Sequence, residues 1–356
     1  MTWSFDKILK AARRFNASDI HLVLNVAPIL RISGEIRPIE GEPLSGEALQ
    51  ELVYGLLNEQ QREKLDRDWQ LCVSKEWPEV GRFRMSVYFH SGFPEVSIRL
   101  CETSVRSRDE LRLPPVLEEL TRMPNGLVLI TGPTGMGKTT TLNYMVDCIN
   151  RSRRAKIVTI EDPIEFVHEN QRSIVVQQEV MTDVRTFRDA LVHVLRQDPD
   201  VIVVGEMRNL ETIETALIAA ETGHLVLATL HTPDCVQTVQ RIYSVFPAEQ
   251  QNSIVAQIAN SLRAIIAQKL LPRADGEGQV LASEICIATI AVRNQIRDRS
   301  VHLIYNEMQT GRKFQMQTMD SALLELYQRG EITYDVALTN ARDPEFIRSK
   351  AGKQNS

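Results

Sequence analysis

The first hundred residues alternate apolar and polar positions, whereas the later part of the chain carries continuous apolar runs. Two stretches near residue 90, "GRFRMSVYFH" and "EVSIRL", alternate with a period of two. Because successive side chains of a strand point to opposite faces, this period predicts a hairpin with one buried and one polar face. The expected apolar face consists of Phe83, Met85, Val87, Phe89, Val96, Ile98 and Leu100.

From Val116 onward, short apolar runs alternate with segments of helical period. Such runs are typical of a parallel sheet that is covered by helices on both faces. The expected strands are 127–131, 157–160, 201–204 and 225–229. A later strand pair is expected at 263–272 and 282–288, within a tail that is otherwise mostly helical in pattern.

The chain length of 356 residues exceeds one ordinary core and predicts two domains. Polar and charged residues dominate between Glu102 and Pro115, which is typical of a linker. We therefore expect a smaller α+β domain at 1–101, a linker at 102–115 and an α/β domain with a mainly parallel sheet at 116–350. Residues 351–356 are expected to form a disordered tail.

The overall charge argues against a nucleic-acid-binding surface, because Lys+Arg 41 stand against Asp+Glu 46. The five cysteines form no CxxC pair, so neither a zinc ribbon nor a disulfide framework is expected. A reduced, cytosolic protein fits this usage. The longest apolar runs are far shorter than the ~18 residues of a membrane span.

The N-terminal stretch "MTWSFDKILKAARRF" places Ile8, Ala12 and Phe15 on one helical face. A helix of this kind, with basic residues on its other sides, either lies on a membrane surface or packs into a domain core. Core packing is the commoner use and is favoured here.

Residues 132–140, "GPTGMGKTT", match the pattern GxxxxGK[ST] between an apolar strand and a helix. The glycines let backbone N–H groups approach phosphates, and the helix N-terminus adds a partial positive charge. Lys138 is expected to neutralise β/γ-phosphate oxygens, and Thr139 to place its hydroxyl on Mg²⁺. The full set of expected nucleotide contacts is Gly132, Pro133, Thr134, Gly135, Met136, Gly137, Lys138, Thr139 and Thr140. No NKxD element of guanine-binding proteins is present, so ATP is the expected nucleotide.

The acidic residues depart from the usual P-loop arrangement, in which an aspartate that holds Mg²⁺ follows the apolar strand. Here the run 201–204 is followed by Gly205 and only then by Glu206. Ligands of an open parallel sheet lie at the carboxyl ends of its strands, so acids at neighbouring strand ends are candidate replacements. The next strand end supplies Glu161, Asp162 and Glu165.

Glu206 is the expected general base toward the attacking water, with Glu165 positioning water or metal; the reverse assignment is the alternative. Thr139, Glu165 and Glu206 are the expected metal-site residues, and Mg²⁺ commonly keeps several waters besides. His231, at the carboxyl end of its strand, is expected to sense the γ-phosphate. His224 stands at the opposite end, where structural hydrogen bonding is the favoured role.

Together these motifs resemble the secretion-ATPase superfamily, and within it the PilT-like type IV pilus retraction ATPases. "ASDIHL" (17–22) is similar to the N-terminal signature of that family, "GPTGMGKTTT" to its Walker A motif, and "EDPIEF" to its Asp box. "RQDPDVIVVGEMRN" is similar to its Walker B motif and "TGHLVLATLHT" to its His box. "AVRNQIRD" (291–298) resembles the segment associated with retraction.

The chain departs from the family pattern at three positions. Gln295 and Asp298 stand where the retraction segment usually has Leu and Glu, and Val192 stands where many relatives carry a basic residue one turn before Arg196. Assembly-type pilus ATPases and type II secretion ATPases usually carry a four-cysteine zinc element. This chain lacks one, which favours the retraction branch.

The resemblance implies a homohexamer of subunits with a PAS-like N-terminal and a RecA-like C-terminal domain, located in the cytoplasm at the inner face of the inner membrane. The motor would hydrolyse ATP with Mg²⁺ and act on an inner-membrane pilus platform protein, meeting the membrane through that partner only. An accessory paralogous ATPase is a further candidate partner, and nucleic acid is not expected.

The resemblance also assigns roles to residues outside the phosphate motif. Arg82, Arg84 and Arg99 share the polar face of the predicted hairpin, and the last two correspond to arginines that close over the γ-phosphate. Arg293 and Asn294 correspond to residues of force transmission.

Three alternatives remain open at this point. A secretion-system or accessory pilus ATPase would share every motif but act on another platform. A RecA-like DNA motor would need basic and aromatic single-strand contacts, which the sequence does not offer. A non-enzymatic nucleotide-regulated adaptor would leave the carboxylates idle.

Overall fold

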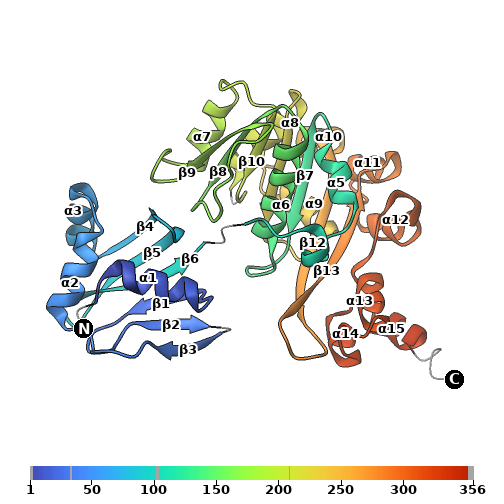
Figure 1. Ribbon diagram of the computed structural model, residues 1–356. Helices are drawn as coiled ribbons and strands as arrows, with labels where there is room; N and C mark the ends of the chain where they lie inside the picture. The colour runs from blue at the N-terminus through green and yellow to red at the C-terminus, as the bar shows by residue number, and fades with distance from the viewer. Residues whose placement is uncertain (1–2, 33, 102–103, 208, 352–356) are drawn as a thin grey trace. The chain divides into compact units, whose positions relative to one another are not determined.

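The computed structural model describes residues 3–32, 34–101, 104–207 and 209–351 and divides into two compact units (Figure 1). The first comprises Met1–Ser104 with Pro163–Val167, and the second comprises Val105–Asp162 with His168–Ser356. The domain bounds expected from the sequence stay a prediction. Of the expected disordered tail, only Ala351 is described, as the last residue of a helix; 352–356 lie outside the described residues.

The first unit is built on a six-stranded antiparallel sheet with strand order β3-β2-β1-β6-β5-β4. Its elements are α1 (Phe5–Arg14), β1 (Asp19–Leu22), β2 (Ile29–Ile32), β3 (Glu35–Pro38), α2 (Gly46–Gly55), α3 (Glu59–Asp68), β4 (Gln70–Trp77), β5 (Gly81–His90) and β6 (Phe93–Leu100). The predicted hairpin is β5 and β6, and Phe83, Met85 and Val87 lie in the core. Ile8 and Ala12 of α1 pack into the same core, so core packing of the N-terminal helix is confirmed. The prediction was wrong for Phe15, which follows the last residue of α1 and is 51% exposed.

The second unit contains a seven-stranded sheet with strand order β13-β12-β7-β11-β10-β8-β9. Its strands are β7 (Gly126–Thr131), β8 (Lys156–Glu161), β9 (Ile174–Glu179), β10 (Val201–Val204), β11 (Leu225–Leu230), β12 (Leu262–Pro272) and β13 (Gln279–Ile287). All neighbours are parallel except the β12–β13 hairpin. The sequence pattern did not predict β9, because this edge strand is only partly buried and carries polar residues at half its positions.

Helices cover both faces of this sheet, which is why its inner strands are apolar throughout. One face packs against α5 (Val116–Thr121) and α6 (Lys138–Ser152). The other packs against α7 (Phe187–Val194), α8 (Leu210–Glu221), α9 (Cys235–Ser244), α10 (Gln251–Ser261) and α11 (Ile290–Arg297). Burial of apolar area on two faces supplies most of the stabilisation of such a sheet.

A smaller C-terminal cluster of helices packs on the far part of the β12–β13 hairpin (Figure 1). The remaining elements are α12 (Ile304–Thr310), α13 (Met319–Gln328), α14 (Tyr334–Asn340), α15 (Pro344–Ala351) and two 3₁₀ turns, η1 (Val301–Leu303) and η2 (Gly311–Phe314). Leu271 and Val280 of the hairpin pack into the same apolar cluster as Leu323 of α13.

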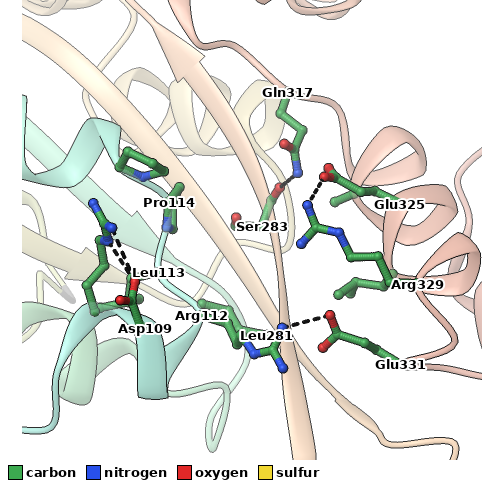
Figure 2. A pocket seen from close by; sticks show the side chains of 14 residues that line it. Asp109, Arg112, Leu113, Pro114, Leu281, Ser283, Gln317, Glu325, Arg329 and Glu331 are labelled. Atoms are coloured by element: carbon green, nitrogen blue, oxygen red, sulfur yellow. Dashed lines mark hydrogen bonds and ion pairs between the residues drawn. The ribbon is translucent and has the colours of Figure 1, made fainter.

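The segment expected to be a linker packs onto the second unit over its described later part. Residues 108–111 form α4 (Arg108–Leu111), and Leu113 is buried. Arg112 Nη1 lies 2.8 Å from Glu331 Oε1 across a cavity of about 560 Å³ that β13 and α13 also line (Figure 2). This stretch is therefore anchored rather than a free tether.

Asp320 organises the C-terminal helices, and its loss tests this packing. The carboxylate is buried and accepts hydrogen bonds from Arg342 N at 2.7 Å, Asp343 N at 3.2 Å and Tyr305 Oη at 2.9 Å. Asp320→Ala leaves these donors without an acceptor, so we expect the local free energy of opening to fall by roughly 2 kcal/mol. The measurement is amide hydrogen exchange across Pro344–Ala351. Asp335→Ala, at an exposed position in α14, is the matched control and should exchange as wild type; equal exchange in both variants would contradict this account.

Candidate active site

The phosphate motif forms a loop between β7 and α6 with the geometry that the pattern predicts. Gly132 has a φ of 140°, and a Cβ atom there would lie 2.5 Å from the carbonyl oxygen of Gln268 in β12. A side chain at Gly132 is therefore excluded by backbone and not merely disfavoured. Gly137, with a φ of 77°, is the N-cap of α6, which begins at Lys138.

Lys138 is the buried cation of this loop, with an exposed fraction of 8%. Its Nζ donates hydrogen bonds to the carbonyl oxygens of Gly132 at 2.7 Å and Pro133 at 2.9 Å. Burial lowers the pKa of Lys138, and the negative charge of Glu206 acts in the opposite direction. The pKa is lowered overall, and the two carbonyl oxygens hold the ammonium at the loop.

His231, Glu206 and Thr134 meet at the same edge of the sheet. His231 Nε2 lies 2.9 Å from Glu206 Oε1, while its Nδ1 lies 3.4 Å from both Lys138 Nζ and Thr134 Oγ1. The imidazole therefore bridges the phosphate loop at the end of β7 and the acid that follows β10. This edge is the carboxyl edge of the parallel strands, where the sequence placed the site.

A side chain at Gly205, which stands at the usual aspartate position, would be crowded by the backbone of β8. A Cβ atom at Gly205 would lie 3.2 Å from the carbonyl oxygen of Ile160 and 3.4 Å from Cα of Glu161. The backbone is pinned at this spacing, since Gly205 N donates to Ile160 O at 2.8 Å and Gly205 O accepts from Thr229 Oγ1 at 2.5 Å. The acidic residue stands at the next position in the sequence, Glu206.

The acids of the "EDPIE" segment lie in different surroundings, and the role expected for Glu165 stays a prediction. Glu161 is buried and accepts hydrogen bonds from Thr159 Oγ1 at 2.6 Å and Gln177 Nε2 at 3.0 Å, within its own sheet. Asp162 and Glu165 are exposed. Glu165 lies in Pro163–Val167, which groups with the first unit.

A polar contact beneath the phosphate loop was not predicted from the sequence. Gln268, fully buried on β12, donates from Nε2 to Thr141 Oγ1 at 2.7 Å, in the first turn of α6. Leu270 N also reaches Met136 Sδ at 3.2 Å. Since β12 follows the loop by more than a hundred residues, no local sequence signal could have paired them.

His224 makes structural hydrogen bonds, which is the role that the sequence favoured, and the expectation for Val192 stays a prediction. His224 Nδ1 lies 3.0 Å from Ala219 O and 3.2 Å from Thr222 Oγ1, at the end of α8 and away from the phosphate edge. Val192 is exposed on α7. Neither residue contributes a described contact to the phosphate loop.

In the first unit, Arg84 and Arg99 are directly opposed on β5 and β6. Arg99 Nε lies 2.9 Å from Asp19 Oδ1, and Asp19 also accepts from Ser18 Oγ at 2.8 Å. Burial acts to raise the pKa of Asp19, but Ser18 and Arg99 outweigh it, so the pKa is lowered overall. Asp19, within "ASDIHL", thus forms an ion pair with Arg99, one of the two opposed arginines.

Sequence comparison identifies the family. The family described as type II/IV secretion system protein matches residues 75–355. The chain belongs to that family.

Relatives within this secretion family match over nearly the whole chain. The chain is 41% identical over 339 residues to the type IV pilus retraction ATPase PilT of Pseudomonas aeruginosa, covering 95% of this chain and 98% of that protein. It is 38% identical over 344 residues to the type IV pilus ATPase PilU of the same organism, covering 97% and 90%. A crystal structure of the pilus retraction motor PilT with bound ADP matches with a TM-score of 0.92 at 41% identity, covering 98% of this chain and 99% of that chain.

The resemblance to PilT-like ATPases is therefore confirmed, as are the α/β fold class and the expectation of a P-loop ATPase. Within the described residues, no helix is both long and apolar enough to cross a membrane. The assignments of individual site residues remain predictions.

The explanation for Gly205 in this secretion-family member can be tested by substitution. Gly205→Ala should lower the free energy of unfolding by about 1 kcal/mol, because the Ile160 carbonyl must yield to the new methyl group. Gly205→Asp should cost clearly more and should not improve ATPase activity, since its carboxylate would be added beside buried Glu161. Urea unfolding measures the stability of both variants, and phosphate release measures the ATPase activity of Gly205→Asp. Gly55→Ala, at a position with open space, is the control; a Gly205→Ala variant as stable as this control would refute the crowding argument.

Proposed function

We propose that this protein is a hexameric ATPase motor that powers type IV pilus retraction through an inner-membrane platform protein. The observation that carries the proposal is the Lys138–His231–Glu206 cluster on a fold that matches the pilus retraction motor PilT along its whole length. The cluster supports ATP hydrolysis, and the likeness to named pilus ATPases supports the pilus as the load. Both the hexamer and the cytoplasmic position beneath the membrane are parts of the proposal.

ATP is the proposed substrate, held by the loop from Gly132 to Thr140. Backbone N–H groups of the loop and the N-terminus of α6 face the phosphates in this arrangement. Lys138 would exchange the carbonyls of Gly132 and Pro133 for β/γ-phosphate oxygens, which are stronger partners for a buried ammonium.

Mg²⁺ is the metal that this phosphate chemistry implies, and the donors present fit it. Thr139 lies in the first turn of α6 next to Lys138, and the Glu206 side chain is 18% exposed at the same edge. No group of three or more His, Cys, Asp or Glu gathers in metal-binding geometry among the described residues, which suits a cation that keeps most of its water. When bound, it would supply further neutralisation of phosphate charge, with Glu165 as a second candidate ligand.

Hydrolysis requires a base near the attacking water, and Glu206 is the proposed base. Its hydrogen bond to His231 Nε2 orients the carboxylate and places the imidazole between it and Lys138. His231 would then detect whether a γ-phosphate is present beside Lys138 and pass that information to Glu206. Glu165 remains the alternative base.

Arg84 and Arg99 are proposed to act on the γ-phosphate after the first unit of a subunit closes on the nucleotide. An arginine that meets a transferring phosphoryl group contributes ~10³–10⁵ in rate. Asp19 pairs with Arg99 Nε at 2.9 Å, and the side chains of Arg84 and Arg99 are both exposed.

The segment "AVRNQIRD" forms α11, and its departures from the family pattern have structural consequences. Gln295 Nε2 donates to Glu307 Oε1 of α12 at 3.0 Å, a bond that leucine could not make. Asn294 is exposed on the same helix, and Arg293 is half-buried. These two remain the proposed residues of force transmission.

An accessory role beside a second retraction ATPase is the other candidate function, favoured by the 38% identity to PilU over 97% of the chain. Deleting the gene and imaging pili tests the proposal. Cells with abundant pili that do not retract support the retraction motor, whereas loss of pili indicates an assembly role. Normal retraction that fails only under load would indicate the accessory role.

The choice of base is tested by isosteric substitutions. Glu206→Gln keeps a hydrogen-bond acceptor for His231 but removes the base, so kcat should fall by ~10²-fold or more while ATP still binds. Lys138→Ala should instead lose ATP binding, because the phosphate charge has no cation. The measurements are phosphate release and nucleotide Kd in the assembled protein. Near wild-type turnover in Glu206→Gln together with an inactive Glu165→Gln would reverse the assignment.

The arginine proposal is tested by Arg84→Ala and Arg99→Ala. Because these side chains would meet the γ-phosphate only on closure, we expect kcat to fall by ~10²-fold or more with little change in ATP Kd. Arg37→Ala, an exposed arginine on edge strand β3, is the control and should retain wild-type kcat. If both test variants turn over ATP like this control, the arginines are ordinary surface residues.

A further inference from the structure

A buried carboxylate on β13 lies against the first residue of α9, the helix that follows His231. Glu284 is 2% exposed, and its Oε1 accepts a hydrogen bond from Cys235 N at 2.8 Å. Cys235 is the first residue of α9 and is itself fully buried. The side chain and its partner are thus both removed from water.

The start of α9 needs such an acceptor. The first N–H groups of a helix have no partner within the helix, and a buried one is costly to leave unpaired. The N-cap Asp234 accepts from Gln237 N at 2.7 Å and so satisfies a different donor. Glu284 supplies the acceptor for Cys235 N, and the positive end of the helix favours a carboxylate there.

The turn between β11 and α9 is short and is held at both of its ends. At the β11 end, Leu230 O accepts from Gly132 N at 3.3 Å, and Thr229 O accepts from Met207 N at 3.0 Å. At the α9 end, the fixing contacts are the Glu284–Cys235 bond and a Thr232 Oγ1–Thr238 Oγ1 contact at 2.6 Å. His231 lies between these ends, with its ring 42% exposed.

We infer that Glu284 is a positioning residue for His231: by fixing the start of α9 it holds the turn that carries the imidazole against Lys138 and Glu206. The inference rests on the proposed role of His231 in the nucleotide site and assigns no contact between Glu284 and the nucleotide. A shift of about 1 Å at the imidazole would be enough to disturb its 2.9 Å and 3.4 Å contacts, and displacements of that size can cost ~10²-fold in rate.

Burial raises the pKa of Glu284, while the N–H groups of Cys235 and Met319, the first residues of α9 and α13, lower it in part. The neutral acid is thereby favoured more than for an ordinary glutamate. Glutamine is close in shape to the neutral acid and keeps a carbonyl oxygen for Cys235 N. Methionine is similar in length and has no such oxygen.

Glu284→Gln and Glu284→Met therefore form a matched pair that differs mainly in the acceptor. We expect Glu284→Met to lower kcat for ATP hydrolysis about tenfold or more, with the Kd for ATP within about twofold of wild type. Glu284→Gln should restore most of the turnover. Amide exchange over residues 231–238 should be faster in the methionine variant and not in the glutamine variant. Equal kcat in the two variants would overturn the inference.

A double-mutant cycle separates positioning from general loss of structure. In a His231→Ala background, Glu284→Met should lower kcat by less than about twofold, because the side chain that it positions is already gone. A full additional loss in that background would show that Glu284 acts elsewhere. If His231→Ala alone has wild-type kcat, the proposed role of His231 fails first, and this inference fails with it.

A second variant keeps the test decisive if Glu284→Met does not fold. Glu284→Asp shortens the side chain by one methylene and withdraws the acceptor from Cys235 N. The expected result is again a lower kcat with an unchanged Kd for ATP, and wild-type turnover in this variant would overturn the inference.

Discussion

The ammonium group of Lys138, held in a place almost closed to water, is the constraint on which the rest of the active edge depends. A buried charge is tolerated only with partners, and here the carbonyls of Gly132 and Pro133 and the carboxylate of Glu206 supply them. The same loop passes so close to β12 that a Cβ atom at position 132 would lie 2.5 Å from the carbonyl oxygen of Gln268. His231 lies within 3.4 Å of the ammonium and 2.9 Å of Glu206.

Close packing of the parallel strands decides where the acid chemistry can be placed. Beyond Val204 the backbone of β8 lies so close to the position usually held by an aspartate that a Cβ atom at Gly205 would be crowded. Glu206, one residue later, points instead to His231. Glu161 is buried and accepts hydrogen bonds from Thr159 and Gln177.

The first unit is organised by a different principle, because its sheet is apolar on one face and charged on the other. The side chains of Phe83, Met85 and Val87 lie in the core. Arg84 and Arg99 lie opposite each other on the polar face of the hairpin. Two opposed guanidinium groups repel each other, and Asp19 offsets that repulsion by pairing with one of them. Both arginine side chains are exposed, and Arg84 is the one that Asp19 does not pair with.

The sequence by itself determined whatever depends on neighbouring residues. The period of two predicted β5 and β6, the apolar runs predicted the inner parallel strands, and eight adjacent positions were enough to identify the phosphate loop. These features are local, because side-chain alternation and a glycine-rich turn are set by residues a few positions apart. The edge strand β9 was not predicted, because it is only partly buried and its sequence shows neither a continuous apolar run nor strict alternation.

Only the tertiary structure decided which distant residues share the site. Gln268 lies under the phosphate loop, Asp19 pairs with Arg99, and Glu284 meets Cys235, although each pair is separated by tens of residues or more. Glu165 follows a strand of the same sheet as Glu206, yet Pro163–Val167 groups with the first unit, so its expected place beside Glu206 stays a prediction. Strand order and crossover connections bring such residues together or keep them apart, and no local pattern records that order.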